Sequence, residues 1–207
     1  MRNYPGYALE AGEDSHRESA GGIVIRQAQL ADVPAMLRLV NGYADQELML
    51  PRTEVEICER IRDFVVAMDG DEFVGCGAIQ FYSPDMAELR SLAVSPDRVH
   101  GGVGQRIAGE ILDQAREVGV EVVFAFTYVP LFFSKLGFQS IQREELPLKA
   151  WRDCMRCPKF NACDEMAMAC YLTPDGEKHI SKAPPSETFL EGPLVMPTVG
   201  KHRVIDQ

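Results

Sequence analysis

The glycine-rich segment His100-Gly101-Gly102-Val103-Gly104 is the part of the sequence whose residue types point most directly to chemistry. It follows the apolar run Leu92-Ala93-Val94 and precedes a long stretch with apolar residues at helical spacing. Glycines let a backbone approach a ligand closely, and the N–H groups and dipole at a helix start attract an anion. The segment has neither the Gly-x-Gly-x-x-Gly pattern of dinucleotide-binding folds nor the Lys-Ser/Thr of a P-loop. We therefore predict a pyrophosphate-binding turn of another class.

Apolar periodicity and turn residues predict the elements that position this loop. Thr53 and Glu56 have the spacing of a capping box, and Asp69-Gly70-Asp71-Glu72 between two apolar runs predicts a hairpin. Hairpin strands come first and strand–helix–strand units follow, which favours a mixed α/β (α+β) fold with helices on both faces of the sheet. Strands are predicted at 23–26, 64–68, 73–81, 87–94, 122–127, 138–141 and 166–172, and helices begin near 32, 53, 103 and 130.

One domain of residues 23–173 accounts for these elements. Residues 1–22 mix glycine, serine and charged residues without periodicity, so we expect a flexible leader. Residues 174–207 contain five prolines and little periodicity. They predict an extended tail, with packing on the domain or on a neighbouring subunit as the open alternative.

The composition argues against several classes of function. The formal net charge is −10 and the pI is about 4.9. Such an acidic surface repels phosphate backbones, so no nucleic-acid partner is expected. No apolar run approaches the roughly 18 residues of a membrane span, and residues 1–22 lack the apolar stretch of a signal peptide. We expect a cytoplasmic protein with no membrane partner, whose six cysteines stay reduced.

Several stretches resemble the GNAT acetyltransferase superfamily in their order and spacing. They are residues 87–96, the glycine loop, and residues 131–138 ending in Gly-Phe, while residues 25–34 are similar to the family's first strand and helix. The likeness covers about residues 23–145. It implies a mostly antiparallel central sheet with a split between two parallel strands, residues 88–94 and 122–127, that holds acetyl-CoA as co-substrate.

The resemblance also implies which residues bind acetyl-CoA. Backbone N–H groups around Leu92, Ala93 and Val94 would bind the thioester carbonyl and stabilise the oxyanion. Val99 stands where the family usually has Gln or Arg, so we expect weaker or rearranged side-chain contacts to the phosphates. Phe133 stands where a tyrosine often serves as general acid. The remaining cofactor-binding candidates are Val99, His100, Gly101, Gly102, Val103, Gly104, Gln105, Phe132 and Phe133.

Two residues are the candidates for proton transfer. Glu88 would act as general base, through a water molecule, on the ammonium group of the acceptor. The alternative for Glu88 is an exposed strand residue or an ion pair with Arg90. Tyr128 follows the opposite strand and is the candidate acid, with a half-buried structural tyrosine as the alternative. A thiolate with a pKa of about 8.5 is a tolerable leaving group, so no acid is strictly required.

Residues 48–54 and 151–165 further resemble the short, kinase-free bacterial form of N-acetylglutamate synthase. This likeness implies transfer of acetyl to the α-amino group of L-glutamate, the first step of arginine biosynthesis. Arg52 and Arg90 would bind the two carboxylates in bidentate fashion, although each is otherwise a surface arginine. The alternatives are another amine (a polyamine, an aminoglycoside or a protein N-terminus) or a non-catalytic acetyl-CoA-binding module.

The cysteine-rich segment near residue 160 contains potential metal ligands. Cys154 and Cys157 have the spacing of a zinc knuckle, but the spacing to Cys163 and Cys170 fits no common zinc module. We predict no metal, with structural zinc at Cys154, Cys157 and Cys163 as the less favoured alternative. Analogy with the superfamily allows a homodimer.

Overall fold

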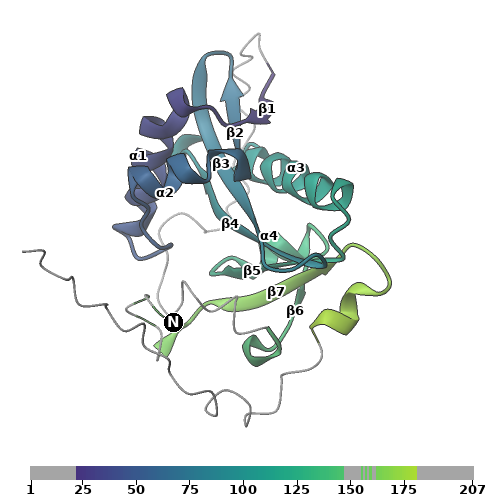
Figure 1. The fold of residues 1–207 in the computed structure, drawn as a ribbon. Coiled ribbons are helices and arrows are strands. Elements are labelled where there is room, and N and C mark those ends of the chain that lie inside the picture. The colour runs from purple at the N-terminus through teal and green to yellow at the C-terminus, as the bar shows by residue number, and fades with distance from the viewer. Residues whose placement is uncertain (1–21, 147–154, 156, 158, 160–161, 181–207) are drawn as a thin grey trace, which may run out of the picture. The chain divides into compact units, whose positions relative to one another are not determined.

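The computed structural model describes residues 22–146, 155, 157, 159 and 162–180 (Figure 1). Each predicted helix and strand is present, and its bounds agree with the prediction to within two residues. The helices are α1 (Val33–Ala44), α2 (Glu54–Glu59), α3 (Val103–Glu117) and α4 (Pro130–Ser134). The strands are β1 (Val24–Gln27), β2 (Phe64–Asp69), β3 (Glu72–Phe81), β4 (Met86–Val94), β5 (Val122–Thr127), β6 (Gln139–Ser140) and β7 (Met166–Tyr171).

The sheet has the strand order β1-β2-β3-β4-β5-β7-β6, and its pairs β1–β2, β2–β3, β5–β7 and β6–β7 are antiparallel. The carbonyl of Asp85 accepts bonds from the N–H groups of Glu121 and Val122 at 2.9 and 3.0 Å. Strands β4 and β5 therefore begin side by side and run in the same direction, as predicted for the parallel pair. The described residues divide into a first unit, residues 22–81 and 88–118, and a second unit, residues 82–87 and the described residues from 119 to 180.

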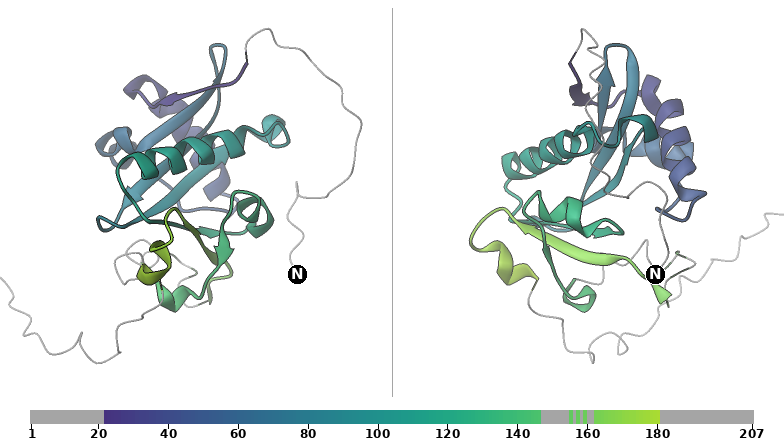
Figure 2. Two further views of the ribbon diagram at one scale, coloured as in Figure 1. Left: turned by 90° about the vertical axis from the view of Figure 1, so that its right-hand side faces the viewer. Right: turned by 180° about the vertical axis from the view of Figure 1, so that it is seen from behind.

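Strand β3 of the first unit carries helices on both of its faces, as Figure 2 also shows for α1 and α3. Successive side chains of a strand point to opposite faces. Cys76 and Ala78 share a buried cluster with residues of α1, whereas Gly75 and Gly77 lie under α3. An ideal Cβ on Gly75 would come within 2.9 Å of both the Ala93 carbonyl oxygen and Ile107 Cδ1, so a larger residue would have to displace the backbone of β4 as well as a side chain of α3.

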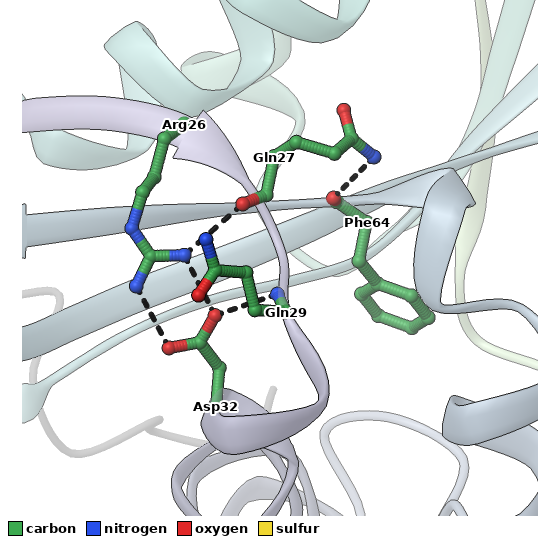
Figure 3. Close-up of polar contacts among 5 residues, drawn as sticks. All are labelled: Arg26, Gln27, Gln29, Asp32 and Phe64. Carbon is green, nitrogen blue, oxygen red and sulfur yellow. Dashed lines mark hydrogen bonds and ion pairs between the residues drawn. The ribbon is translucent and has the colours of Figure 1, made fainter.

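An ion pair fixes the start of α1 against β1 (Figure 3). The Arg26 guanidinium donates two hydrogen bonds to the carboxylate of Asp32, at 2.7 and 2.8 Å, and the Gln29 N–H donates a third at 2.8 Å. These bonds, led by those from Arg26, lower the pKa of Asp32 below its ordinary value. The Gln27 amide also donates to the Phe64 carbonyl at 2.8 Å, which ties the end of β1 to β2.

Helix α2 begins with the predicted capping box. The Thr53 hydroxyl accepts from the Glu56 N–H at 3.2 Å, and the Glu56 carboxylate accepts from the Thr53 N–H at 2.8 Å. Ile57 is fully buried, while Val55 is 64% exposed. The six-residue helix thus buries one side chain fully rather than an extended apolar stripe.

The second unit has its own apolar core. Residues 176–179 form a 3₁₀ helix, and Ile180 is buried in this core. These residues fall within the segment predicted to be an extended tail; residues 181–207 and the predicted leader to residue 21 lie outside the described residues. Within the described part, no helix combines the length and apolar character needed to cross a membrane. The buried members of the core are Met86, Val122, Phe124, Leu146, Ala167, Ala169 and Ile180.

Candidate active site

The glycine loop forms the N-terminal end of α3, as its residue types predict. Gly102 is the N-cap residue and has φ +73°, the left-handed conformation that glycine adopts at least cost. Its carbonyl accepts the helical bond from the Arg106 N–H at 3.2 Å. The first N–H groups of a helix have no acceptor within the helix, so those of Val103, Gly104 and Gln105 lie at a common edge. This edge has the donors and the dipole that a phosphate requires.

Arg98 stands beside the unusual Val99, and its side chain holds the loop in place. Its guanidinium lies 2.8 Å from the carboxylate of Asp69 and 3.1 Å from that of Glu72, at the β2–β3 turn. Val99 is half-buried and His100 is exposed. Arg98 therefore ties the loop to a hairpin of the same unit through pairs with acidic side chains.

Strand β4 departs from regular geometry directly before Leu92. Ser91 has φ +51°, and Glu47 is the other non-glycine residue of the described chain with a positive φ. Such a conformation costs an L-residue about 1–2 kcal/mol. Beyond Ser91, the Val94 carbonyl accepts from the Tyr43 hydroxyl at 2.7 Å. The strained residue directly precedes Leu92, Ala93 and Val94, which were predicted to face the thioester, and the serine itself gave no sequence signal for this conformation.

Glu88 and Arg90 lie together on β4, in a nearly buried setting. Both side chains are 11% exposed, and Arg90 NH1 lies 3.7 Å from Glu88 Oε2. The alternative of an exposed Glu88 is therefore wrong, whereas its alternative as an ion-pair partner of Arg90 agrees with this distance.

Two further members of this cluster, Gln80 and Arg60, were not predicted from the sequence. Gln80 Oε1 accepts from Arg90 NH1 at 2.5 Å and from Arg60 NH1 at 3.3 Å. A single glutamine in the otherwise apolar run of residues 73–81 is the sequence signal from which a buried polar contact could have been predicted. Gln80 thus links the strand residue Arg90 to an arginine that follows α2.

Arg52 is held through its main chain. The Asn41 side chain accepts from the Arg52 N–H and donates to the Arg52 carbonyl, both at 2.9 Å. This pair of bonds fixes the segment before α2 to α1, and the Arg52 side chain is half-buried.

The other predicted site residues belong to the second unit. Phe133 is buried, with ring contacts to Phe132 and Phe138 at 5.2 and 5.1 Å between centroids. Tyr128 is half-buried, and Lys159 Nζ lies 3.5 Å from its hydroxyl. Burial first, and then a hydrogen bond with Asp164, raise the pKa of Tyr128. The hydroxyl is therefore protonated at neutral pH, as a general acid must be, but it gives up its proton reluctantly.

The described cysteines form no metal-ligand cluster with one another. Cys163 Sγ lies 3.8 Å from the Glu165 carboxylate, Cys157 is half-buried, and Cys154 lies outside the described residues. The described residues contain one group with metal-compatible side chains, which is Asp85, Glu121 and His179. His179 Nε2 already hydrogen-bonds Glu121 at 3.0 Å.

Comparisons with known proteins agree with this geometry. Residues 33–138 match the model of the acetyltransferase (GNAT) family. The chain is 42% identical to an uncharacterized N-acetyltransferase of Chlorobaculum tepidum, over 72% of this chain and 96% of that protein. It is 35% identical to an amino-acid acetyltransferase of Mycobacterium tuberculosis, over 73% of this chain and 88% of that protein.

A solved structure extends the likeness to three dimensions. N-acetylglutamate synthase from Neisseria gonorrhoeae, complexed with coenzyme A and N-acetyl-glutamate, has a TM-score of 0.68 and 28% identity, and the match covers 74% of this chain and 36% of that one. Three findings support membership of the same family: the family match, the identity to relatives over most of their length, and the glycine loop at the start of α3. The chain therefore belongs to the GNAT family and is an acyltransferase.

Proposed function

We propose that the protein transfers the acetyl group of acetyl-CoA to the α-amino group of L-glutamate. The buried Glu88–Arg90 pair on β4, in the strand that leads to the glycine loop, is the observation that carries this proposal. It puts a candidate base and a candidate carboxylate-binding group side by side. The names of the relatives support an amino acid as acceptor, and the solved synthase complex supports coenzyme A and glutamate.

The protein must support three steps of the reaction: proton removal from the amine, stabilisation of the oxyanion and departure of the thiolate. Glu88 takes the ammonium proton through a water, so that the neutral amine can attack the thioester carbonyl carbon. Backbone N–H groups of Leu92–Val94 donate to the oxygen that becomes negative in the tetrahedral intermediate. The nitrogen then gives up its second proton to solvent, the C–S bond breaks, and the CoA thiolate accepts a proton from Tyr128 or from solvent.

Glutamate recognition is assigned to two arginines. The guanidinium groups of Arg52 and Arg90 match the two carboxylates in planar, bidentate geometry. Each charge-assisted contact contributes about 1.5–3 kcal/mol, so loss of one is expected to weaken acceptor binding by roughly 10- to 150-fold. In this proposal the product enters arginine biosynthesis, in the cytoplasm.

The test is thiol release from acetyl-CoA with a panel of amino acids, polyamines and aminoglycosides. We expect turnover with L-glutamate, a rise in its KM in Arg52→Ala, and a fall in kcat of about 10²–10⁴-fold in Glu88→Gln. Arg116→Ala is the matched control, because Arg116 lies on the exposed side of α3 and pairs with Asp113. Turnover with another amine alone would overturn glutamate as the acceptor, and binding of acetyl-CoA without turnover would favour a non-catalytic module.

A further inference from the structure

Asp85, Glu121 and His179 form the group of metal-compatible side chains in the described part of the chain, and the proposed function does not use them. The three residues come from segments that are far apart in the sequence. Asp85 directly precedes β4, Glu121 directly precedes β5, and His179 ends the 3₁₀ helix that follows β7 and is yellow in Figure 1. All three belong to the second unit, so the group lies within one part of the molecule.

The backbone holds these three segments together. The Asp85 carbonyl accepts from the Glu121 N–H at 2.9 Å. Gly176 packs against the Glu121 carbonyl so closely that a Cβ on this glycine would overlap the oxygen. The C-cap residue of the 3₁₀ helix, Ile180, is buried in the core of the same unit. The main chain therefore fixes the places from which the three side chains project.

Both ring nitrogens of His179 face a carboxylate. Nε2 lies 3.0 Å from Glu121 Oε2, and Nδ1 lies 4.0 Å from Asp85 Oδ2. One ligand atom of each residue lies within 4.8 Å of those of the other two. The side chains of His179 and Glu121 are 30% exposed and that of Asp85 is 44% exposed, so a hydrated ion can reach them.

The charges of the group are unequal. Asp85 and Glu121 carry two negative charges, whereas the imidazole between them can carry one positive charge at most. Lys178 is attracted to Glu121, but its ion-pair partner is Asp175 in the same 3₁₀ helix. A divalent cation balances both carboxylates and leaves the imidazole neutral, which is the form that binds a metal.

We propose that Asp85, Glu121 and His179 bind a divalent transition-metal ion, with Zn²⁺ as the ion that fits their chemistry. Zinc binds imidazole nitrogen and carboxylate oxygen at about 2.0–2.2 Å, so two ligand atoms on a tetrahedral ion lie about 3.3 Å apart. The 3.0 Å between His179 Nε2 and Glu121 Oε2 is close to this spacing. The half-exposed Asp85 side chain supplies the third ligand after a shift of about 1–2 Å. Mg²⁺ and Ca²⁺ prefer oxygen ligands alone, so the imidazole selects against them.

The ion joins the ends of three chain segments. It ties the 3₁₀ helix of residues 176–179 to the residues that begin β4 and β5. The Thr173 hydroxyl lies 3.4 Å from Glu121 Oε2 and orients this ligand. The site is separate from the cysteine-rich segment, and it is independent of the proposed acetyl transfer, since none of its residues was assigned to that reaction.

Calorimetric titration of the whole, chelator-treated protein with ZnCl₂ tests the site. We expect His179→Gln and Glu121→Gln each to bind zinc at least about 100-fold more weakly at this site, because each variant loses a ligand. Asp175→Asn is the matched control, since it removes a negative charge from the same 3₁₀ helix but no ligand. Circular dichroism verifies that each variant is folded. Wild-type affinity in both ligand variants, or an equal loss in the control, overturns the proposal.

NMR of the His179 ring nitrogens shows which residue holds the ion. The signals are assigned by their loss in His179→Gln, and one of the two nitrogens should shift strongly as one equivalent of zinc is added. Zinc binding that leaves these signals unchanged would place the ion on other residues, such as the thiols, and would refute the site. Ring signals of a doubly protonated imidazole that persist with zinc would identify an ion pair with the carboxylates instead, and would also refute it.

Hydrogen exchange measures the effect of the ion on the fold. Zinc should slow the exchange of the backbone N–H groups of residues 176–180 in the wild-type protein and in Asp175→Asn, but not in His179→Gln. This result is expected because the ion restrains the 3₁₀ helix against the rest of the unit. Exchange that zinc leaves unchanged in the wild-type protein would overturn the role of the ion in joining these segments.

Discussion

Replacing Gly77 by alanine tests the close contact between β3 and α3. A Cβ at this position would lie 2.8 Å from Ile107 Cγ2, 2.9 Å from Ile111 Cδ1 and 3.3 Å from Leu92 Cδ1. Two of these contacts come from the helix that carries the glycine loop, and the third comes from the strand predicted to bind the thioester. The substitution therefore presses on both parts of the candidate acetyl-CoA site in the first unit.

The size of the effect follows from ordinary contact distances. Carbon atoms pack best at about 3.5–4.0 Å, so α3 or its side chains must move by roughly 0.7 Å. Overpacking of this kind lowers the free energy of unfolding by about 1–3 kcal/mol. Alanine offsets about 0.5–1 kcal/mol of this loss, because it loses less conformational entropy than glycine when the strand folds. We expect Gly77→Ala to lower the free energy of unfolding by about 1–2 kcal/mol and to weaken acetyl-CoA binding, because the loop moves with α3.

Urea unfolding followed by circular dichroism measures the stability, and calorimetric titration measures acetyl-CoA affinity. The matched control is Gly42→Ala, since Gly42 lies within α1 and a Cβ there would meet nothing within 4 Å. This control should raise the free energy of unfolding by up to about 1 kcal/mol and leave affinity unchanged. A Gly77→Ala protein as stable as the control, with wild-type affinity, would refute the argument that glycine is required for this packing.

Three further outcomes follow from single residues. Asp32→Asn should lower the free energy of unfolding by about 2 kcal/mol at pH 7, because it removes the charged bonds from Arg26. Since the folded-state pKa of Asp32 is lowered, the difference in this free energy between variant and wild type, measured by urea unfolding, should shrink as the pH falls below about 4. A difference that stays constant with pH would contradict the assignment. Gly102→Ala should lower the free energy of unfolding by about 1–2 kcal/mol, because alanine is strained at φ +73°. It should also bind acetyl-CoA more weakly in calorimetric titration. A wild-type free energy of unfolding together with a wild-type affinity would show that the loop tolerates a side chain. Cys76 is fully buried and its pKa is raised to about 12, so mass spectrometry should find it unmodified after iodoacetamide treatment of the folded protein at about pH 8, and labelling before unfolding would disprove its burial.

The sequence predicted the parts of the fold that depend on local signals. Gly70 has φ +60° in the β2–β3 hairpin, where it was expected to turn the chain, and Gly119 has φ +84° after α3. The capping box of Thr53 and Glu56 likewise involves residues three positions apart. Such features are predictable because the residues that determine them are neighbours in the sequence.

The parts that were missed depend on contacts between distant segments. Gln80 meets Arg60, 20 residues earlier, and Arg90, 10 residues later, and no local pattern predicts that three such residues meet. Ser91 has a positive φ although serine has no preference for it, so the surrounding strand must impose this conformation. The burial of Ile180 also results from tertiary packing, because the residues before it show no periodic apolar pattern.

The predicted site at the glycine loop must bind an anionic ligand although the protein is acidic. With a net charge of −10, the surface as a whole repels phosphate, so attraction must come from groups fixed close to the ligand. Arg98 lies next to the loop, but its charge is paired with Asp69 and Glu72. Asp69 has a side chain only 6% exposed, so this pair is screened little by salt and holds the loop firmly. We therefore propose that the arginine contributes order, while the N–H groups and the dipole at the start of α3 provide the positive potential of the predicted phosphate site. In this proposal Val99 can stand where the resemblance implies a polar residue, because the backbone supplies the contacts to the phosphates.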